Sequence, residues 1–468
     1  MISRIALHWR WLRRLVSRNL WAARLLGVRH PPGESAEPGL ILIQFDGLSR
    51  MQFEKAVSAG RLPFLAKLIK RKHFTLETFY SGVPSTTPAV QGEIFFGVKA
   101  SVPSFQFFRR GAARDFRMFE AASALEIEEE LLRACPEPLL QGGHGYSNIY
   151  RAGAARSYYC SRDFAPEEIW RRLHFLRWLL LCIVYLPKII RMAALAVLEF
   201  ALALVDAVGG LFARENLFKE LAFVPARIAI CVVLREAIRF RMLLDIERGV
   251  RVIHANFLGY DEQAHRRGPS SAFAHWSLKA LDRTVRDIYR AANDSHYRDY
   301  EVMVYSDHGQ EHTTPYRVKH GRELEEALRE VFSHSPLAGH AIWMRKNSDL
   351  IGGTVESCRA FFGIRRKAVS KITPDPETQI IVTAMGPLGH LYFPEILAEA
   401  DMEALAKELD VNETQVIHMA LTKLASDVLP AYELDDGPLT AKQVAALRKD
   451  VEKHNPRGKL ISRESLFK

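Results

Sequence analysis

Short apolar runs that end at polar residues recur along the chain. The run at residues 40–45 reads Leu-Ile-Leu-Ile-Gln-Phe and stops at Asp46-Gly47, which is typical of a buried strand followed by a turn. Residues 61–72 repeat apolar positions at helical spacing. Further strands are predicted at residues 252–257, 302–305 and 379–383. Strands that alternate with helices predict an α/β fold with a mostly parallel sheet flanked by helices.

The pattern changes between residues 165 and 245, where long apolar stretches of helical spacing replace the short strands. The stretch at 192–212 is about long enough to span a bilayer. It contains Glu199 and Asp206, and each central acidic group costs about 2.5–3.5 kcal/mol in hydrocarbon. We therefore expect a helical cap or hairpin that docks on a membrane or dips into it. The alternative is a soluble helical subdomain. The other apolar stretches are residues 176–186 and 223–234.

Both ends of the chain are helical in pattern. Residues 1–37 begin as a basic amphipathic helix, which either lies on an anionic membrane surface or packs on the protein's own body. Residues 396–468 form a charged helical appendage, and 405–414 resembles the helical half of ribbon-helix-helix DNA-binding proteins. No convincing basic strand precedes that segment, so a plain appendage, which could drive oligomer formation, is favoured over DNA binding. The predicted organisation is 1–37, a catalytic domain in two parts at 38–164 and 246–395, the insertion at 165–245, and the appendage at 396–468.

Composition narrows the partners and the compartment. The 468 residues are 48% hydrophobic and 25% charged, which is ordinary for a globular protein. The net charge of +10 suits phosphate esters, anionic lipid surfaces or nucleic acid. The five cysteines are scattered without CxxC spacing, and no signal-peptidase site follows the basic start. We expect a cytoplasmic, membrane-associated protein without a cleavable signal peptide.

Side chains suited to hard metal ions stand just after several of the predicted strands. The carboxyl ends of parallel strands are where such sheets place their sites. Carboxylate oxygens and imidazole nitrogens without thiolates favour zinc, with manganese as an alternative. Each residue alone means little, but their joint order, with a hydroxyl-rich turn after the first, indicates a site. The candidates are Asp46, Asp261, His265, Asp307, His308 and His390.

The order of these motifs resembles the type I phosphodiesterase / nucleotide pyrophosphatase branch of the alkaline phosphatase superfamily. The most specific piece is Asp-x3-His-x2-Gly-Pro at 261–269, and the resemblance covers roughly residues 38–395, interrupted by the apolar insertion. It implies an alkaline-phosphatase-like fold and hydrolysis of phosphate esters. The other pieces are Pro-Ser-x-Thr at 84–87, Ser-Asp-His-Gly at 306–309 and Gly-His at 389–390.

The resemblance also implies a threonine nucleophile and two divalent metals. Thr87 would attack phosphorus, and two nearby cations would acidify its hydroxyl, activate the water that hydrolyses the phospho-threonine, and offset charge on the phosphoryl oxygens. Thr86 is the alternative nucleophile. The first metal would be held by Asp46, Asp307, His308 and the Thr87 oxygen, and the second by Asp261, His265 and His390.

Substrate contacts are less defined. The family often has an Asn after the nucleophile that helps to hold the phosphate, whereas this chain continues Pro88-Ala89-Val90-Gln91. Gln91 could substitute, and His312 and His320 could touch substrate. Without that Asn, the preference for diesters or monoesters is open. His254, inside an apolar strand, is expected to be a core residue.

The candidate residues constrain the topology, because Asp46 and Thr87 precede the insertion and Asp261 follows it. If they share one site, the insertion crosses a membrane an even number of times. The predicted function is a metal-dependent phosphodiesterase or phosphatase. The alternatives are a membrane-surface scaffold with an inactive phosphatase-like fold and a nucleic-acid-binding regulator that acts through the C-terminal tail.

Overall fold

The computed structural model describes residues 18–28, 35, 37–160, 175–212, 225, 227–312, 314, 316–333, 336–344, 374–385, 388–395 and 399–409. The chain divides into two compact units, residues 1–397 and residues 398–468. All elements described below belong to the first unit except α15 (Glu399–Leu409).

A five-stranded sheet forms the centre of the first unit, and every neighbouring pair of its strands is parallel. The strands predicted at 40–45, 252–257 and 302–305 are three adjacent members of it. The mostly parallel α/β fold predicted from the sequence is therefore confirmed. In spatial order the strands are β5 (Arg156–Tyr158), β4 (His144–Tyr146), β6 (Val252–Phe257), β1 (Gly39–Phe45) and β7 (Tyr300–Tyr305).

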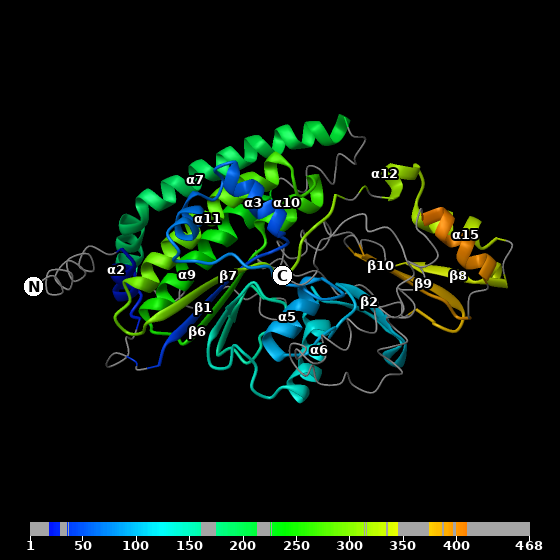
Figure 1. Ribbon diagram of the computed structural model, residues 1–468, viewed down its shortest axis with the longest axis horizontal. Helices are drawn as coiled ribbons and strands as arrows, with labels where there is room; N and C mark the ends of the chain where they lie inside the picture. The colour runs from blue at the N-terminus through cyan, green and yellow to red at the C-terminus, as the bar shows by residue number, and fades with distance from the viewer. Residues whose placement is uncertain are drawn as a thin grey trace, which may run out of the picture. The chain divides into compact units, whose positions relative to one another are not determined.

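The two faces of the sheet differ because strand side chains alternate. On one face Ile43 and Phe45 of β1 and Phe257 of β6 join the main apolar core. On the other face Gln44 and His254 are buried polar side chains. Helices cover both faces (Figure 1). The apolar face packs against α3 (Arg50–Ser58), α4 (Pro63–Lys70), α9 (Arg235–Glu247), α10 (Gly259–Arg267) and α11 (Ala272–Asn293), and α5 (Thr87–Phe96) and α6 (Ala121–Ala134) lie on the opposite side.

The strand predicted at 379–383 is real, but it lies outside the central sheet. It is β9 (Gln379–Met385), the middle of a three-stranded sheet. His390 lies inside the next strand, β10, whereas the sequence placed it in the segment beyond a strand end. The third strand is β8 (Ala341–Met344), β10 covers Leu388–Tyr392, and a hairpin is formed by β2 (Gln106–Arg109) and β3 (Arg114–Arg117). Shorter helical elements are η1 (Arg110–Ala112), α12 (Tyr316–His320), α13 (Leu324–Val331) and η4 (Pro336–Gly339).

The apolar insertion contains one long helix where the sequence predicted two stretches. Helix α7 runs without interruption over Phe175–Phe212 and includes Pro187. A proline removes one backbone hydrogen bond from a helix and usually bends it without ending it. Within the part of the chain that the structure describes, Phe175–Val205 is the single helical stretch with the length and composition to cross a membrane. The stretch predicted at 223–234 ends as the helical turn η3 (Ala229–Leu234), which leads into α9.

The described parts of the two chain ends are short. Helix α2 (Arg18–Leu25) buries Leu20, Ala22 and Ala23, and the two alanines pack with Leu181 of α7 in one apolar cluster. This part of the basic segment therefore packs on the protein's own body, whereas residues 1–17 lie outside the described residues. Of the C-terminal appendage, α15 is described, and residues 410–414 of the segment that resembles ribbon-helix-helix proteins lie outside the described residues.

Candidate active site

Two turns at the carboxyl ends of β1 and β7 are tied together by hydrogen bonds. The backbone N–H of Gly47 donates to Oδ1 of Asp307 over 3.3 Å. The N–H of Leu48 donates to the Ser306 hydroxyl over 2.9 Å. That hydroxyl in turn donates to the backbone carbonyl of His308 over 2.9 Å. Because adjacent parallel strands end at the same edge of the sheet, the turns that carry Asp46, Asp307 and His308 meet there.

Thr87 reaches the same point from the opposite side of the sheet edge. It is the first residue of α5, and its hydroxyl donates to Oδ1 of Asp46 over 3.2 Å. The same hydroxyl oxygen lies 3.2 Å from Nε2 of His308. Thr86 occupies the N-cap position without a side-chain cap bond, and its hydroxyl is buried without a hydrogen-bond partner. Of the two candidate nucleophiles, the structure therefore places Thr87 against the acidic cluster.

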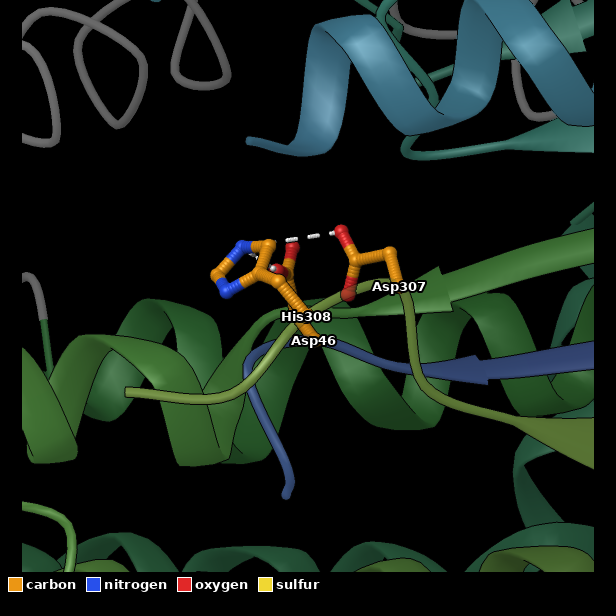
Figure 2. Close-up of side chains that lie close together, drawn as sticks. All are labelled: Asp46, Asp307 and His308. Atoms are coloured by element: carbon orange, nitrogen blue, oxygen red, sulfur yellow. Dashed lines mark ion pairs between the residues drawn. The ribbon is translucent and has the colours of Figure 1, made fainter. Parts of the chain in front are cut away.

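Asp46, Asp307 and His308 form a compact group of potential metal ligands (Figure 2), with one ligand atom from each lying within 4.8 Å of the others. Both aspartates are buried, at 2% and 0% exposure. Oδ2 of Asp307 has no hydrogen-bond partner and lies 3.6 Å from Nε2 of His308. Unpaired buried charge is costly, and a divalent cation would neutralise it. Two buried carboxylates, one with an oxygen that has no hydrogen-bond partner, together with an imidazole are suitable ligands for such a cation.

The titration behaviour of this group reflects its crowded negative charge. Burial, and then the neighbouring Asp46 carboxylate, raise the pKa of Asp307 to about 7. Burial acts to lower the pKa of His308, but the Asp307 carboxylate, with Asp46 and Asp261, raises it well above its usual value. Protons therefore compensate in part for the charge in the metal-free site. A cation bound there would take over that role.

Asp261 and His265 form a second pair close to the first group. They stand four residues apart on α10, so they share one face of the helix, and His265 Nε2 lies 3.2 Å from Asp261 Oδ2. Gln310 donates from its side-chain amide to Oδ1 of Asp261. The same Oδ1 lies where a side chain on Gly47 would point, so the positive φ of Gly47 and the close approach of Asp261 both require glycine there.

The sixth predicted metal ligand, His390, makes a side-chain contact with the segment that leads into β2. Its Nε2 lies 3.0 Å from the hydroxyl of Ser104. Among the described residues, Asp46, Asp307 and His308 are the one group of three metal-binding side chains whose ligand atoms all lie within 4.8 Å of one another. Of the predicted second metal centre, the structure brings Asp261 and His265 into contact, and the role of His390 stays a prediction.

Gln91 contacts the scaffold at both ends of its amide. Its nitrogen donates to Oε1 of Gln44 over 3.0 Å, and its oxygen accepts from the backbone N–H of Ile149 over 2.9 Å. Gln91 is one helical turn after Thr87, and Gln44 is two strand residues before Asp46. One turn of helix and two residues of strand both advance about 6 Å, so the Gln91–Gln44 and Thr87–Asp46 bonds form two rungs between α5 and β1.

Asn256 is a site residue that the sequence analysis did not single out. Its amide donates to Oδ2 of Asp46 over 2.7 Å, which turns the other carboxylate oxygen toward Thr87. Asn256 stands beside Gln44 in the register of β6 and β1, and Tyr305 of β7 stands on the other side of Gln44. Asn256 and Gln44 are amide residues near the ends of otherwise apolar strands, and this sequence pattern could have predicted that they line the site.

The remaining histidines differ in position. His312 is exposed, and its ring occupies the space where a side chain on Gly268, directly after α10, would point. His320 is exposed and stacks on Tyr316 with 4.4 Å between ring centroids. His254 is buried as expected and contacts Asn148 and Tyr305, and burial lowers its pKa to about 3. Substrate contact by His312 and His320 stays a prediction.

Residues 149–373 match the model of the family described as type I phosphodiesterase / nucleotide pyrophosphatase. No curated protein and no solved structure matches the chain. The matched range includes Asp261, His265, Asp307 and His308, while Asp46 and Thr87 precede it. These two enter the site through the geometry of β1 and α5. The match and the α/β sheet agree with the order of motifs in the sequence, and together they support the predicted kinship with the type I phosphodiesterase / nucleotide pyrophosphatase family and with it the activity of a phosphoric ester hydrolase.

Proposed function

We propose that this protein hydrolyses phosphate esters by attack of the Thr87 hydroxyl on phosphorus. The observation that carries the proposal is the position of that hydroxyl, 3.2 Å from both Asp46 Oδ1 and His308 Nε2 at the amino end of α5. The attack forms a bond from Thr87 Oγ1 to phosphorus and breaks the bond to the leaving oxygen, which departs with a proton. Water then attacks the phospho-threonine and regenerates the hydroxyl.

The side chains around Thr87 have separate tasks in this proposal. Asp46, Asp307 and His308 would hold one divalent metal, for which zinc is favoured and manganese is the alternative. Bound there, the ion would acidify the nucleophile and offset phosphoryl charge. Asn256 orients the Asp46 carboxylate. The first backbone N–H groups of α5 favour an anionic group at the helix start, because they have no partner within the helix.

A second metal is proposed on Asp261, His265 and His390. The contact between Asp261 and His265 supports two of these ligands. Burial acts to raise the pKa of Asp261, but the neighbouring His265 outweighs this effect and lowers the pKa below its usual value. This carboxylate therefore stays ionised at neutral pH. His390 is proposed from the resemblance to the family alone. If metal analysis of the fully active protein finds one metal per chain, the second centre is refuted.

The function is tested by hydrolysis assays on the full chain. The protein is stripped with a chelator, reloaded with zinc or manganese, and assayed with nitrophenyl phosphate and bis(nitrophenyl) phosphate. We expect turnover of at least one ester that is lost with the chelator and restored by one of the metals. The ratio of the two rates gives the preference for diesters or monoesters. Metal-loaded protein inactive on both esters, or full activity without metal, would refute the proposal.

Gln91→Leu is expected to lower kcat by about 10- to 100-fold with little change in KM. The substitution removes the Gln91–Gln44 bond between α5 and β1, so the position of Thr87 against Asp46 is no longer fixed. Misplacement of a reacting group by about 1 Å lowers rates by this order. Gln52→Leu is the matched control, because Gln52 is also buried but bonds to Ser270 and His275. Metal content should stay normal in both variants. A rise in KM with unchanged kcat would instead indicate that Gln91 binds substrate.

A further inference from the structure

Helix α7 turns one narrow side toward the central sheet and the helices packed on it, which we call the catalytic body. The side chains on that side recur at helical spacing and are buried or half-buried: Leu181, Tyr185, Lys188, Met192, Glu199 and Ala203. Each of its polar groups has a partner on the body. The Tyr185 hydroxyl donates to Asn19 over 3.3 Å, and Lys188 pairs with Asp287 of α11 at 2.9 Å.

The strongest of these tethers surrounds Glu199, which is 7% exposed. Arg227 donates to one of its carboxylate oxygens over 2.8 Å, and the indole N–H of Trp276 donates to the other over 3.0 Å. Arg227 is itself buried and lies over the ring of Phe273. Glu199, one of the two acidic groups that made a membrane span marginal in the sequence, is therefore paired with the rest of the protein.

The opposite side of α7 is apolar and exposed. Exposed side chains recur seven residues apart at Leu176, Ile183, Ile190 and Val197, with exposures of 65%, 57%, 60% and 70%. A water-soluble surface helix has the reverse arrangement, with its apolar side on the body and its polar side in solvent. Contiguous apolar surface of this extent marks an interaction site.

The exposed side also carries charge of one sign. Between residues 175 and 205 its charged side chains are Arg177 and Arg191, and the one acidic residue of that range, Glu199, faces the body. Arg191 lies near Arg283 of α11. Burial, followed by the positive charge of Arg191, lowers the pKa of the Arg283 guanidinium. Over residues 175–205 the apolar surface is thus accompanied by positive charge, which suits an anionic partner.

We propose that α7 lies flat in the interface of an anionic lipid bilayer, with the Leu176–Ile183–Ile190–Val197 stripe inserted and its polar side held on the catalytic body. Arginines at such a boundary extend their charged ends to the headgroups while their stems stay in the apolar layer. The proposal is independent of the hydrolytic chemistry. It names the partner surface that would bring the active site to esters at a membrane.

The fold argues against a spanning arrangement of α7. Strands β4 and β6 flank α7 in sequence and pair directly in the same sheet, so the chain must return to its starting side. Residues 213–224, which follow α7, are fewer than the roughly 20 apolar residues that a second crossing needs. Spanning would also pull Glu199 away from Arg227, and separating a buried ion pair leaves uncompensated charge.

A bilayer fits this surface better than a second copy of the chain does. In a symmetric dimer through residues 175–205 of α7, two faces whose charged side chains are arginines would meet, and like charges would be desolvated together. A lipid surface instead supplies anions along the whole helix. Its acyl region accepts apolar side chains without specific shape.

The test uses the full chain and vesicles of phosphatidylcholine, with or without phosphatidylglycerol, in flotation assays. We expect at least 10-fold more bound protein on the anionic vesicles, and release by an alkaline carbonate wash. Brominated lipids should quench the fluorescence of Trp178, which is 45% exposed on α7, and this quenching should be absent in Trp178→Phe. Leu176→Gln/Ile183→Gln/Ile190→Gln should reduce binding at least 10-fold. Arg177→Gln/Arg191→Gln should lower the preference for anionic lipid.

The matched control is Met51→Gln/Met303→Gln, which changes exposed apolar side chains elsewhere (58% and 50% exposed) and should bind as the wild type does. Light scattering reports the oligomeric state of every variant. Flotation of the triple variant equal to wild type would overturn the proposal. So would resistance to carbonate, which indicates spanning, or a wild-type dimer that the triple variant dissociates. None of these readouts uses turnover, so they stand apart from the test of hydrolysis.

Discussion

Thr87→Ala is expected to lower kcat for nitrophenyl ester hydrolysis by at least about 1,000-fold, because it removes the proposed nucleophile of the proposed two-step displacement. The hydroxyl is the one group at the start of α5 that contacts both Asp46 and His308. Loss of a single methyl and hydroxyl from a site at the surface of the acidic cluster should leave the fold intact. Steady-state kinetics with the metal-loaded protein measure the effect.

Thr86→Ala is the matched control for this prediction. It removes the same atoms one residue earlier, where the hydroxyl is buried but has no hydrogen-bond partner, so activity should change by less than about 10-fold. Thr87→Ser should keep a substantial part of the rate, since the attacking oxygen remains. Trapping of a phosphorylated intermediate on residue 87 would support the assignment directly. Wild-type turnover in Thr87→Ala, with loss of turnover in Thr86→Ala, would move the nucleophile to Thr86.

Asp307→Asn is expected to abolish metal binding at the first centre and with it nearly all hydrolysis. The substitution keeps the shape of the side chain, but it removes one of two buried carboxylates and leaves the oxygen that now accepts the Gly47 N–H. Metal analysis of the purified variant should show at least one metal fewer than the wild type. An unchanged metal content would contradict the ligand assignment. Asp282→Asn is the control, because that buried aspartate caps α4 by accepting the N–H groups of Phe64 and Leu65.

Asp307→Asn should lower activity, but without metal it should not lower the stability of the fold. The pKa of Asp307 in the folded state is raised to about 7, so between pH 4 and 7 the folded chain holds a proton that the unfolded chain releases. Stability then falls as pH rises through this window, by on the order of 1 kcal/mol per pH unit. With chelator at pH 8, Asp307→Asn should therefore unfold at the same temperature as the wild type or higher. A lower unfolding temperature would mean that Asp307 stabilises the fold without metal.

These two predictions depend on different amounts of information from the sequence. The grouping of the proposed ligands Asp46, Asp307 and His308 could be predicted because each follows a strand whose apolar run is visible in the chain, and parallel strands end at one edge. The choice between Thr86 and Thr87 could not be made in that way. It depends on which hydroxyl the first turn of α5 directs at Asp46, which is a matter of helix rotation against β1.

His390 and Gln91 have contacts that a local sequence pattern cannot reveal. The sequence places His390 near the end of a strand, but it cannot tell that β9 and β10 form a separate sheet or that Ser104 is the neighbour of His390. Gln91 was assigned by its distance from the nucleophile along the chain. Its partners, Gln44 and Ile149, lie 47 and 58 residues away in the sequence, so no local pattern could have revealed them.

The sequence by itself determined the α/β class, the strands at 40–45, 252–257 and 302–305, the resemblance to the family, and the need for an even number of crossings by the insertion if the residues on either side of it share one site. Periodicity and motif order are local properties of the chain, and they survive without coordinates. The tertiary structure decided the register that sets Thr87 against Asp46, the Asn256 contact, and the side of α7 that faces outward. These depend on pairings between distant residues, above all Glu199 with Arg227 and Trp276, whose partner is fixed only when α7 packs on the body.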